Sequence, residues 1–150
     1  MMIKPAYDEL YLQSNIELHK LLFLDFFQKV PYKNYSFYEL VDIYFSTSEI
    51  RAKMDAGDWS ALNKGDKQLL NDIDISGLKF NMDKNKNIYI DYFIVKWMAE
   101  IYVFLQWKYN IASTEIIKNI PSLSLAKMYS PLHETSIENA CEKLYQKFLT

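Results

Sequence analysis

The stretch DYFIVKWMAEIYVFLQWKYN, residues 91–110, decides the fold. It reads as one helix with an apolar surface on nearly every side. Between Tyr92 and Tyr109, the obviously polar side chains are few: Lys96, Glu100, Gln106 and Lys108. Such a helix must be surrounded by protein or by lipid. Lys96 and Glu100 interrupt the run, and its longest apolar stretch, residues 101–105, is far shorter than the roughly 20 residues of a membrane span. The stretch therefore predicts the buried central helix of a small helical domain.

Capping boxes, in which Ser or Thr precedes Glu by three residues, mark the expected starts of further helices. They begin at Ser14, Ser36, Ser46 and Thr135. The helix that starts at Ser14 is expected to end near Val30, because a residue that precedes a proline, here Pro31, disfavours helical geometry. The helix after Ser46 is expected to end at Gly57 in a left-handed cap.

The neighbours of the central helix also carry start and stop signals. Asp91 is the expected N-cap, and Asn110 is a plausible C-terminal stop. Ser113 is predicted to cap a short helix that ends before Pro121, and Ser122 is predicted to cap the next one. These short, closely spaced helices would pack around residues 91–110.

Residues 74–90 break the helical pattern. Residues 66–73, just before it, predict a short helix. Within residues 78–90, apolar and polar residues alternate before a polar turn, and β-branched and aromatic residues follow the turn at 88–90. This pattern fits either a small β-hairpin or a structured loop. The chain as a whole, residues 1–150, is predicted to be a single all-α domain around the central helix 91–110.

Composition narrows the class of protein. The formal net charge of −2 and the single arginine, Arg51, disfavour nucleic-acid binding and attraction to an anionic membrane. The many aromatic residues are also explained by AT-rich codon usage. One cysteine forms no internal disulfide, which suits a reducing compartment. The first residues lack the apolar core of a secretory signal, so a cytoplasmic protein is expected.

The candidate chemical groups are sparse. His133 and Glu134 follow a Pro131-containing segment between two expected helices, and two interpretations are open. They are either a polar or acid–base pair on a loop, or a helix-start charge beside a histidine that bonds a backbone carbonyl. His19, His133 and Cys141 show no zinc spacing, and no glycine-rich phosphate loop is present. The sequence therefore predicts no metal, no cofactor and no catalytic residue.

Segments spread along the chain resemble small uncharacterised bacterial helical proteins encoded beside toxin-like ADP-ribosyltransferase genes. The resemblance is carried by YDELYL at 7–12, SEIRAKMDAGD at 48–58, YVFLQWKY at 102–109 and MYSPLHE at 128–134. It implies no catalytic residues. It implies a protein partner, a toxin encoded nearby that this chain neutralises.

The leading functional hypothesis is a non-catalytic protein-binding module of the antitoxin or immunity type. Its candidate contact residues are Trp107, Tyr109, Tyr129, Pro131, His133 and Glu134. The alternatives are a nucleic-acid-associated regulator, a purely structural subunit, and a small enzyme with an unrecognised site at His133 or His19. Homo-oligomerisation stays open.

Overall fold

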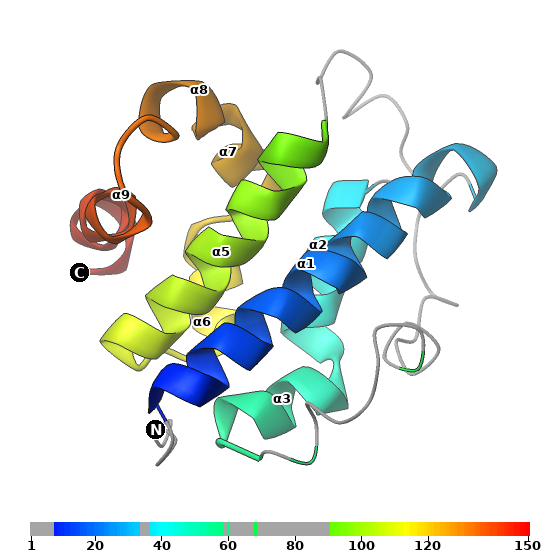
Figure 1. Ribbon diagram of the computed structural model, residues 1–150, viewed down its shortest axis with the longest axis horizontal. Helices are drawn as coiled ribbons and strands as arrows, with labels where there is room; N and C mark the ends of the chain where they lie inside the picture. Colours follow the sequence, from blue (N-terminus) through cyan, green and yellow to red (C-terminus); the bar gives the residue numbers. More distant parts are fainter. Residues whose placement is uncertain (1–7, 34–36, 59, 61–67, 69–90) are drawn as a thin grey trace.

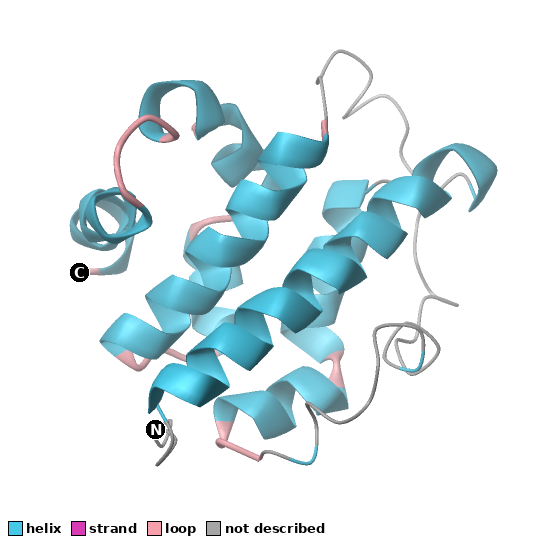
Figure 2. Ribbon diagram, viewed as in Figure 1, coloured by secondary structure: helices cyan, strands magenta, loops and turns pink. Residues whose placement is uncertain are grey.

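The computed structural model describes residues 8–33, 37–58, 60, 68 and 91–150 (Figure 1). Every regular element in this part of the chain is helical (Figure 2). The elements are α1 (Asp8–Lys33), α2 (Phe37–Thr47), α3 (Glu49–Asp55), α5 (Tyr92–Tyr109), α6 (Ser113–Asn119), α7 (Ser122–Lys127), α8 (Tyr129–Leu132), α9 (Ile137–Leu144) and a π-helical turn at Tyr145–Leu149. The predicted all-α fold is confirmed. The expected hairpin at 78–90 and, apart from residue 68, the expected helix at 66–73 lie outside the described residues.

The antiparallel pair of α1 and α5 forms the centre of the fold (Figure 1). α5 also packs against α6, α7 and α9, while α2 packs against α1, α3, α6 and α7. The buried residues of α5 cover most of its circumference: Ile94, Val95, Trp97, Met98, Ala99, Ile101, Tyr102, Val103, Leu105 and Gln106. The predicted buried central helix is therefore confirmed. Within the described ranges, no helix has both the length and the apolar character needed to cross a membrane.

The ends of α5 follow the local signals of the sequence. Asp91 Oδ1 accepts a hydrogen bond of 2.9 Å from the backbone N–H of Ile94, which satisfies one orphan donor of the first turn. Asn110 has a φ of 55°, in the left-handed region that Asn tolerates better than most residues. Both predicted ends are confirmed.

The bounds of α1 differ from the prediction. The helix begins at Asp8, so the Ser14 capping box lies inside it, and it continues past Val30 and Pro31 to Lys33. Tyr11 and Leu12 are buried in the core, and this burial extends the apolar face beyond the predicted start. Pro31 removes one backbone donor, but the loss falls in the last turn of the helix.

Two other starts shift slightly. Ser48, rather than Ser46, caps α3 by accepting from the Arg51 N–H at 3.2 Å. Ser136, rather than Thr135, caps α9. At the end of α3, Gly57 has a φ of 81° and completes the predicted left-handed stop.

Ser113 and Ser122 are not caps, which corrects two predictions. The N-caps of α6 and α7 are Ala112 and Pro121, and neither makes a side-chain capping bond. The caps come instead from other helices. The Ser113 N–H donates to Asp55 Oδ2 at 2.9 Å, and the Ser122 N–H donates to Asp42 Oδ1 at 3.0 Å.

Candidate functional site

The predicted contact residues fall into groups at opposite ends of α5 (Figure 1). Trp107 and Tyr109 lie in its last turn. Tyr129 and Pro131 lie on α8, beside the N-terminal half of α5, and His133 and Glu134 follow directly. The structure therefore does not bring the predicted residues together into one surface.

At the C-terminal end of α5, the aromatic rings pack within the molecule. Tyr109 stacks on Tyr145 with ring centroids 3.9 Å apart and an interplanar angle of 6°. The Trp107 ring lies 5.9 Å from that of Phe104 and lines a small pocket. Both Trp107 and Tyr109 are half-buried. Contacts within the molecule therefore already cover much of the surface of these two rings.

At the other end, α8 leans on α5 through aromatic contacts. The Tyr129 ring meets Trp97 edge-on at 5.4 Å and stacks on His133 at 4.4 Å. His133 Nδ1 bonds the Tyr129 carbonyl at 2.9 Å, as one of the two interpretations of this residue expects. Pro131, His133 and Glu134 are exposed.

Two further aromatic residues stand at the start of α5. The exposed fraction is 46% for Tyr92 and 65% for Phe93, and their rings lie 5.6 Å apart. Phe93 lies one turn before Trp97 and so shares its side of the helix. We group these two residues with those of α8, which meets α5 through the Trp97–Tyr129 contact, and term the group the aromatic surface: Tyr92, Phe93, Tyr129, Pro131 and His133.

Sequence reasoning assigned Tyr92 and Phe93 to the core. In a helix that is apolar on all sides, the pattern does not show which residues face solvent, so the sequence predicts the first turn to be as buried as the middle. Lys96 is the residue of the sequence that indicates the exposure of Tyr92. It follows Tyr92 by one helical turn, and a lysine on that side of the helix indicates that this side faces solvent. Lys96 Nζ lies 5.1 Å from the centroid of the Tyr92 ring.

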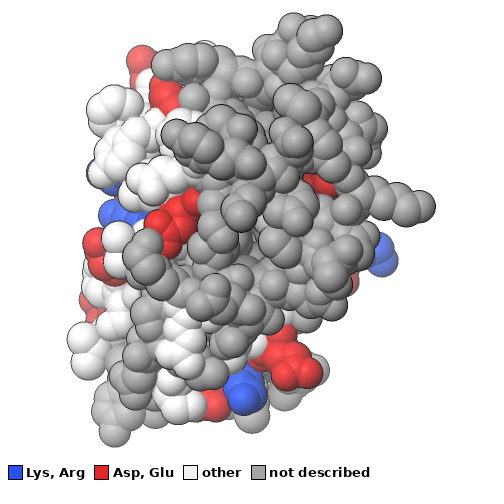
Figure 3. Space-filling model, turned by 90° about the vertical axis from the view of Figure 1, so that its right-hand side faces the viewer, with Lys and Arg blue, Asp and Glu red and all other residues white. Residues whose placement is uncertain are grey.

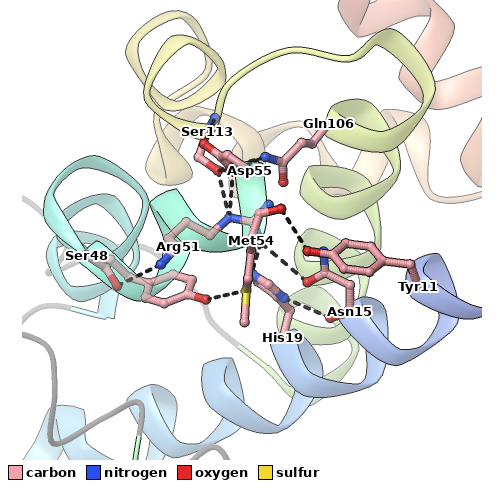
Figure 4. A network of polar contacts seen from close by, with 10 residues as sticks. Tyr11, Asn15, His19, Ser48, Arg51, Met54, Asp55, Gln106 and Ser113 are labelled. Carbon is pink, nitrogen blue, oxygen red and sulfur yellow. Dashed lines mark hydrogen bonds and ion pairs between the residues drawn. The ribbon is translucent and has the colours of Figure 1, made fainter. Parts of the chain in front are cut away.

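A second cluster is polar and buried, and it centres on Arg51 (Figure 4). The Arg51 side chain is 1% exposed. Its Nε donates to Ser113 Oγ at 2.7 Å and lies 3.6 Å from Asp55 Oδ1, and its Nη1 donates to Asn15 Oδ1 at 3.4 Å. These bonds join α1, α3 and α6.

Asp55 balances the guanidinium charge. Its carboxylate accepts from the Ser113 N–H at 2.9 Å, from Ser113 Oγ at 2.6 Å and from Gln106 Nε2. Gln106 brings α5 into the same network, and its Nε2 also lies 3.1 Å from Ser113 Oγ. A buried ion pair with this many hydrogen bonds fixes the relative positions of the helices.

The pocket beside this network is small. Asp55 and Gln106 border it on one side, and Tyr11 and Trp107 border it on another. Its volume of about 20 Å³ is close to what a single water molecule needs. It has no room for a substrate.

Burial favours the neutral forms of two titratable side chains, His19 and Cys141. His19 is fully buried, donates from Nδ1 to the Asn15 carbonyl at 2.8 Å and packs against aromatic rings. Desolvation, with the nearby Arg51 charge second, lowers its pKa well below the usual value. Burial likewise raises the pKa of the Cys141 thiol, which disfavours the reactive thiolate. Among the described residues, no group of His, Cys, Asp and Glu side chains is placed to hold a metal.

Comparison with known proteins found no match: no family model, no curated protein and no solved structure is detectably similar to this chain. The resemblance to proteins encoded beside toxin-like genes therefore stays a prediction. What the described residues define is an all-α domain with a buried ionic network and one exposed aromatic surface.

Proposed function

We propose that this protein is a non-catalytic protein-binding module, of the antitoxin or immunity type, which contacts its partner through the aromatic surface. One observation carries the proposal. Phe93 is 65% exposed at the start of a helix that is otherwise mostly buried, beside the exposed Tyr92. Exposed apolar patches on soluble domains mark interaction sites.

The energetics favour binding at this place. Burying a phenylalanine side chain contributes about 1.5–3 kcal/mol. A partner that covers the exposed Phe93 would therefore gain binding free energy from this burial. Phe93 and Tyr129 are held on packed helices, which reduces the entropy lost on association. Large aromatic side chains on a rigid base commonly act as binding hot spots.

The buried polar cluster supports a scaffold rather than chemistry. Asp55 and Arg51 neutralise each other beside a pocket of about 20 Å³, and His19 is fully buried. His133, the exposed histidine, bonds backbone carbonyls of its own segment. Neither histidine lines that pocket. A general-base mechanism at His19 or His133 therefore gains no support.

The nucleic-acid alternative also loses support. The one arginine of the chain is buried in the network, where it does not reach a phosphate. On the face shown in Figure 3, acidic and basic side chains of the described residues are interspersed. The described residues on this face therefore form no basic stripe, which is the usual footprint of a nucleic-acid interface.

Co-expression with each neighbouring gene product tests the proposal. We expect one neighbour to arrest growth when it is expressed alone and to be tolerated, and co-purified, when this chain is present. Phe93→Ser should abolish both rescue and co-purification. Leu10→Ser is the matched control, because Leu10 is 62% exposed near the opposite end of the α1–α5 pair.

Two results would count against the proposal. If no neighbour is toxic or co-purifies, the antitoxin assignment fails. If a neighbour is neutralised equally well by the Phe93→Ser and wild-type proteins, the aromatic surface is not the contact site.

A further inference from the structure

His19 is a fully buried titratable side chain that the proposed function does not use. Its Nδ1 lies 2.8 Å from the Asn15 carbonyl oxygen, and because a carbonyl oxygen only accepts hydrogen bonds, Nδ1 carries the proton of the neutral ring. A further proton must therefore bind at Nε2. Within the described part of the chain, the buried Nε2 atom has no hydrogen-bond partner. Protonation would place a new N–H donor there with no acceptor from these residues.

The charge that acts on this histidine is that of Arg51 on α3 (Figure 4). Asn15 connects the two side chains, because its carbonyl bonds His19 and its Oδ1 accepts from Arg51 Nη1 at 3.4 Å. Both side chains also contact Phe45: its ring centroid lies 5.7 Å from that of His19 and 5.2 Å from Arg51 Cζ. A protonated His19 would thus be a second cation in one closed cluster, where a low dielectric strengthens the repulsion.

The tyrosines around His19 do not balance such a charge. The Tyr44 ring on α2 lies 5.5 Å from the His19 ring, and Tyr102 on α5 packs on the far side of the cluster, 4.9 Å from Phe45. Burial raises the pKa of Tyr44 to about 12 and that of Tyr102 well above its usual value. On α1 itself, burial raises the pKa of Tyr11 to about 12. All three phenols therefore stay neutral at physiological and acidic pH.

The carboxylates on the helices packed around His19 are engaged elsewhere. On α3, Asp55 lies 3.6 Å from Arg51 Nε and balances that guanidinium. On α2, Asp42 accepts from the Ser122 N–H at 3.0 Å. On α5, Glu100 forms an ion pair with a lysine of α1 at 3.1 Å. The closed cluster therefore accommodates the neutral histidine and disfavours the protonated one.

We infer that His19 is a proton-sensitive switch: its neutral ring allows α3 to close against α1, and proton uptake at Nε2 opens this junction while the α1–α5 pair stays folded. α3 is the element that moves, because a helix of seven residues is held in place by its contacts rather than by its own stability. Opening brings Nε2 into water, where the protonated ring is solvated. Such local openings cost less free energy than unfolding of the whole domain.

The expected pH dependence follows from the preference of the proton for the open form. In that form His19 has its ordinary pKa of about 6.5. In the closed form desolvation, with the Arg51 charge second, lowers this pKa well below the usual value. The ratio of open to closed molecules is therefore nearly constant above about pH 6.5 and rises as the pH falls, by about tenfold between pH 7.5 and 5.5.

Hydrogen exchange of the full chain, followed by NMR, tests the switch. The Ser113 N–H is the reporter, because it donates to Asp55 Oδ2 between α3 and α6 and loses this bond when α3 moves. Its protection factor, corrected for the intrinsic exchange rate, should fall about tenfold between pH 7.5 and 5.5. Low concentrations of urea should leave this factor nearly unchanged, because a local opening exposes little surface. The amide of Leu105, in the buried centre of α5, should respond more strongly to urea.

Variants of the two histidines identify the titrating group. His19→Leu and His19→Gln both remove the titrating ring, and the second keeps a polar side chain if the first does not fold. Each folded variant should lose the tenfold change, whereas His133→Leu, at an exposed site, should keep it.

Three results would overturn the switch. The Ser113 protection factor of the wild-type protein could be the same at both pH values. The tenfold change could survive in the His19 variants, which would assign the proton to another group. The Ser113 and Leu105 amides could show the same dependence on urea, which would mean that the domain opens only by global unfolding.

Discussion

Arg51 shows most clearly how a single residue serves this fold. Its guanidinium is buried against Asp55, Ser113 and Asn15, and its carbon Cζ lies 5.2 Å from the centroid of the Phe45 ring. Nothing local in SEIRAKMDAGD predicts burial, because Arg is mostly exposed in proteins. The burial follows from Asp55, one turn later on α3, and from Ser113 far along the chain. The sequence alone does not reveal that these groups converge.

Replacing Arg51 should therefore be costly. We expect Arg51→Ala to lower the free energy of unfolding by about 3 kcal/mol, because the change leaves the Asp55 carboxylate, whose side chain is only 16% exposed, without its cation. Glu49→Ala, an exposed change on the same helix, should stay within about 0.5 kcal/mol of the wild type. Urea unfolding followed by circular dichroism measures both. A loss below about 1 kcal/mol for Arg51→Ala would mean that the network is not a structural clamp.

His19 makes stability depend on pH. Its pKa in the folded state lies well below that in the unfolded chain, chiefly because of desolvation. The unfolded state therefore binds a proton first as the pH falls. Protonation of His19 therefore costs no stability above about pH 6.5. Below that pH, the free energy of unfolding falls by up to about 1.4 kcal/mol per pH unit.

Measuring the free energy of unfolding at pH 7.5 and 5.5 should show this decline in the wild-type protein. His19→Leu should reduce the difference between the two pH values, whereas His133→Leu, at an exposed site, should leave it as it is. An undiminished pH dependence in His19→Leu would assign the effect to other groups.

At the scale of elements, the sequence predicts helices whose ends are set locally. Local signals act within a single turn at four ends: Asp91, Ser48, Gly57 and Asn110. The sequence pattern predicts three of them directly and places the cap of α3 two residues early, at Ser46. The starts of α6 and α7 are different. Their caps are carboxylates on α3 and α2, and such long-range partners leave no trace in a local pattern.

Asp42 allows this capping between helices to be tested. Asp42→Ala should cost about 1 kcal/mol and speed amide exchange in α7, because the Ser122 N–H loses its acceptor. Asp42→Asn keeps an oxygen acceptor and has no charge to desolvate, whereas desolvation raises the pKa of the Asp42 carboxyl, so Asp42→Asn should be tolerated. Exchange in α9 serves as the internal control. Equal exchange in α7 for the alanine variant and the wild type would contradict the capping role.

At the scale of the whole molecule, the α1–α5 pair buries the centre of α5 and leaves Tyr92 and Phe93, its first two residues, exposed. The sequence predicts the central helix and the α8 side of the aromatic surface, including Tyr129 and Pro131. It does not predict that Phe93 completes that surface, because the direction of an apolar residue depends on which helices cover it. Only the packing of α1, α7 and α8 around α5 decides this.

Because Phe93 itself is 65% exposed and contributes little to the core, Phe93→Ser should separate binding from folding. We expect its thermal unfolding midpoint to stay within a few degrees of the wild-type value, about 0.5 kcal/mol in free energy. Differential scanning calorimetry of the wild-type, Phe93→Ser and Leu10→Ser proteins makes the comparison. A large drop in the midpoint for Phe93→Ser alone would place this side chain in the core rather than in an interface.

The central claim is that the aromatic surface binds a protein partner, and one titration tests it most directly. The partner identified by co-purification is titrated calorimetrically into wild-type, Phe93→Ser and Leu10→Ser proteins. We predict that Phe93→Ser weakens binding by at least about 2 kcal/mol, roughly thirtyfold, while Leu10→Ser binds as the wild type does. Equal affinities for all three proteins would contradict the claim.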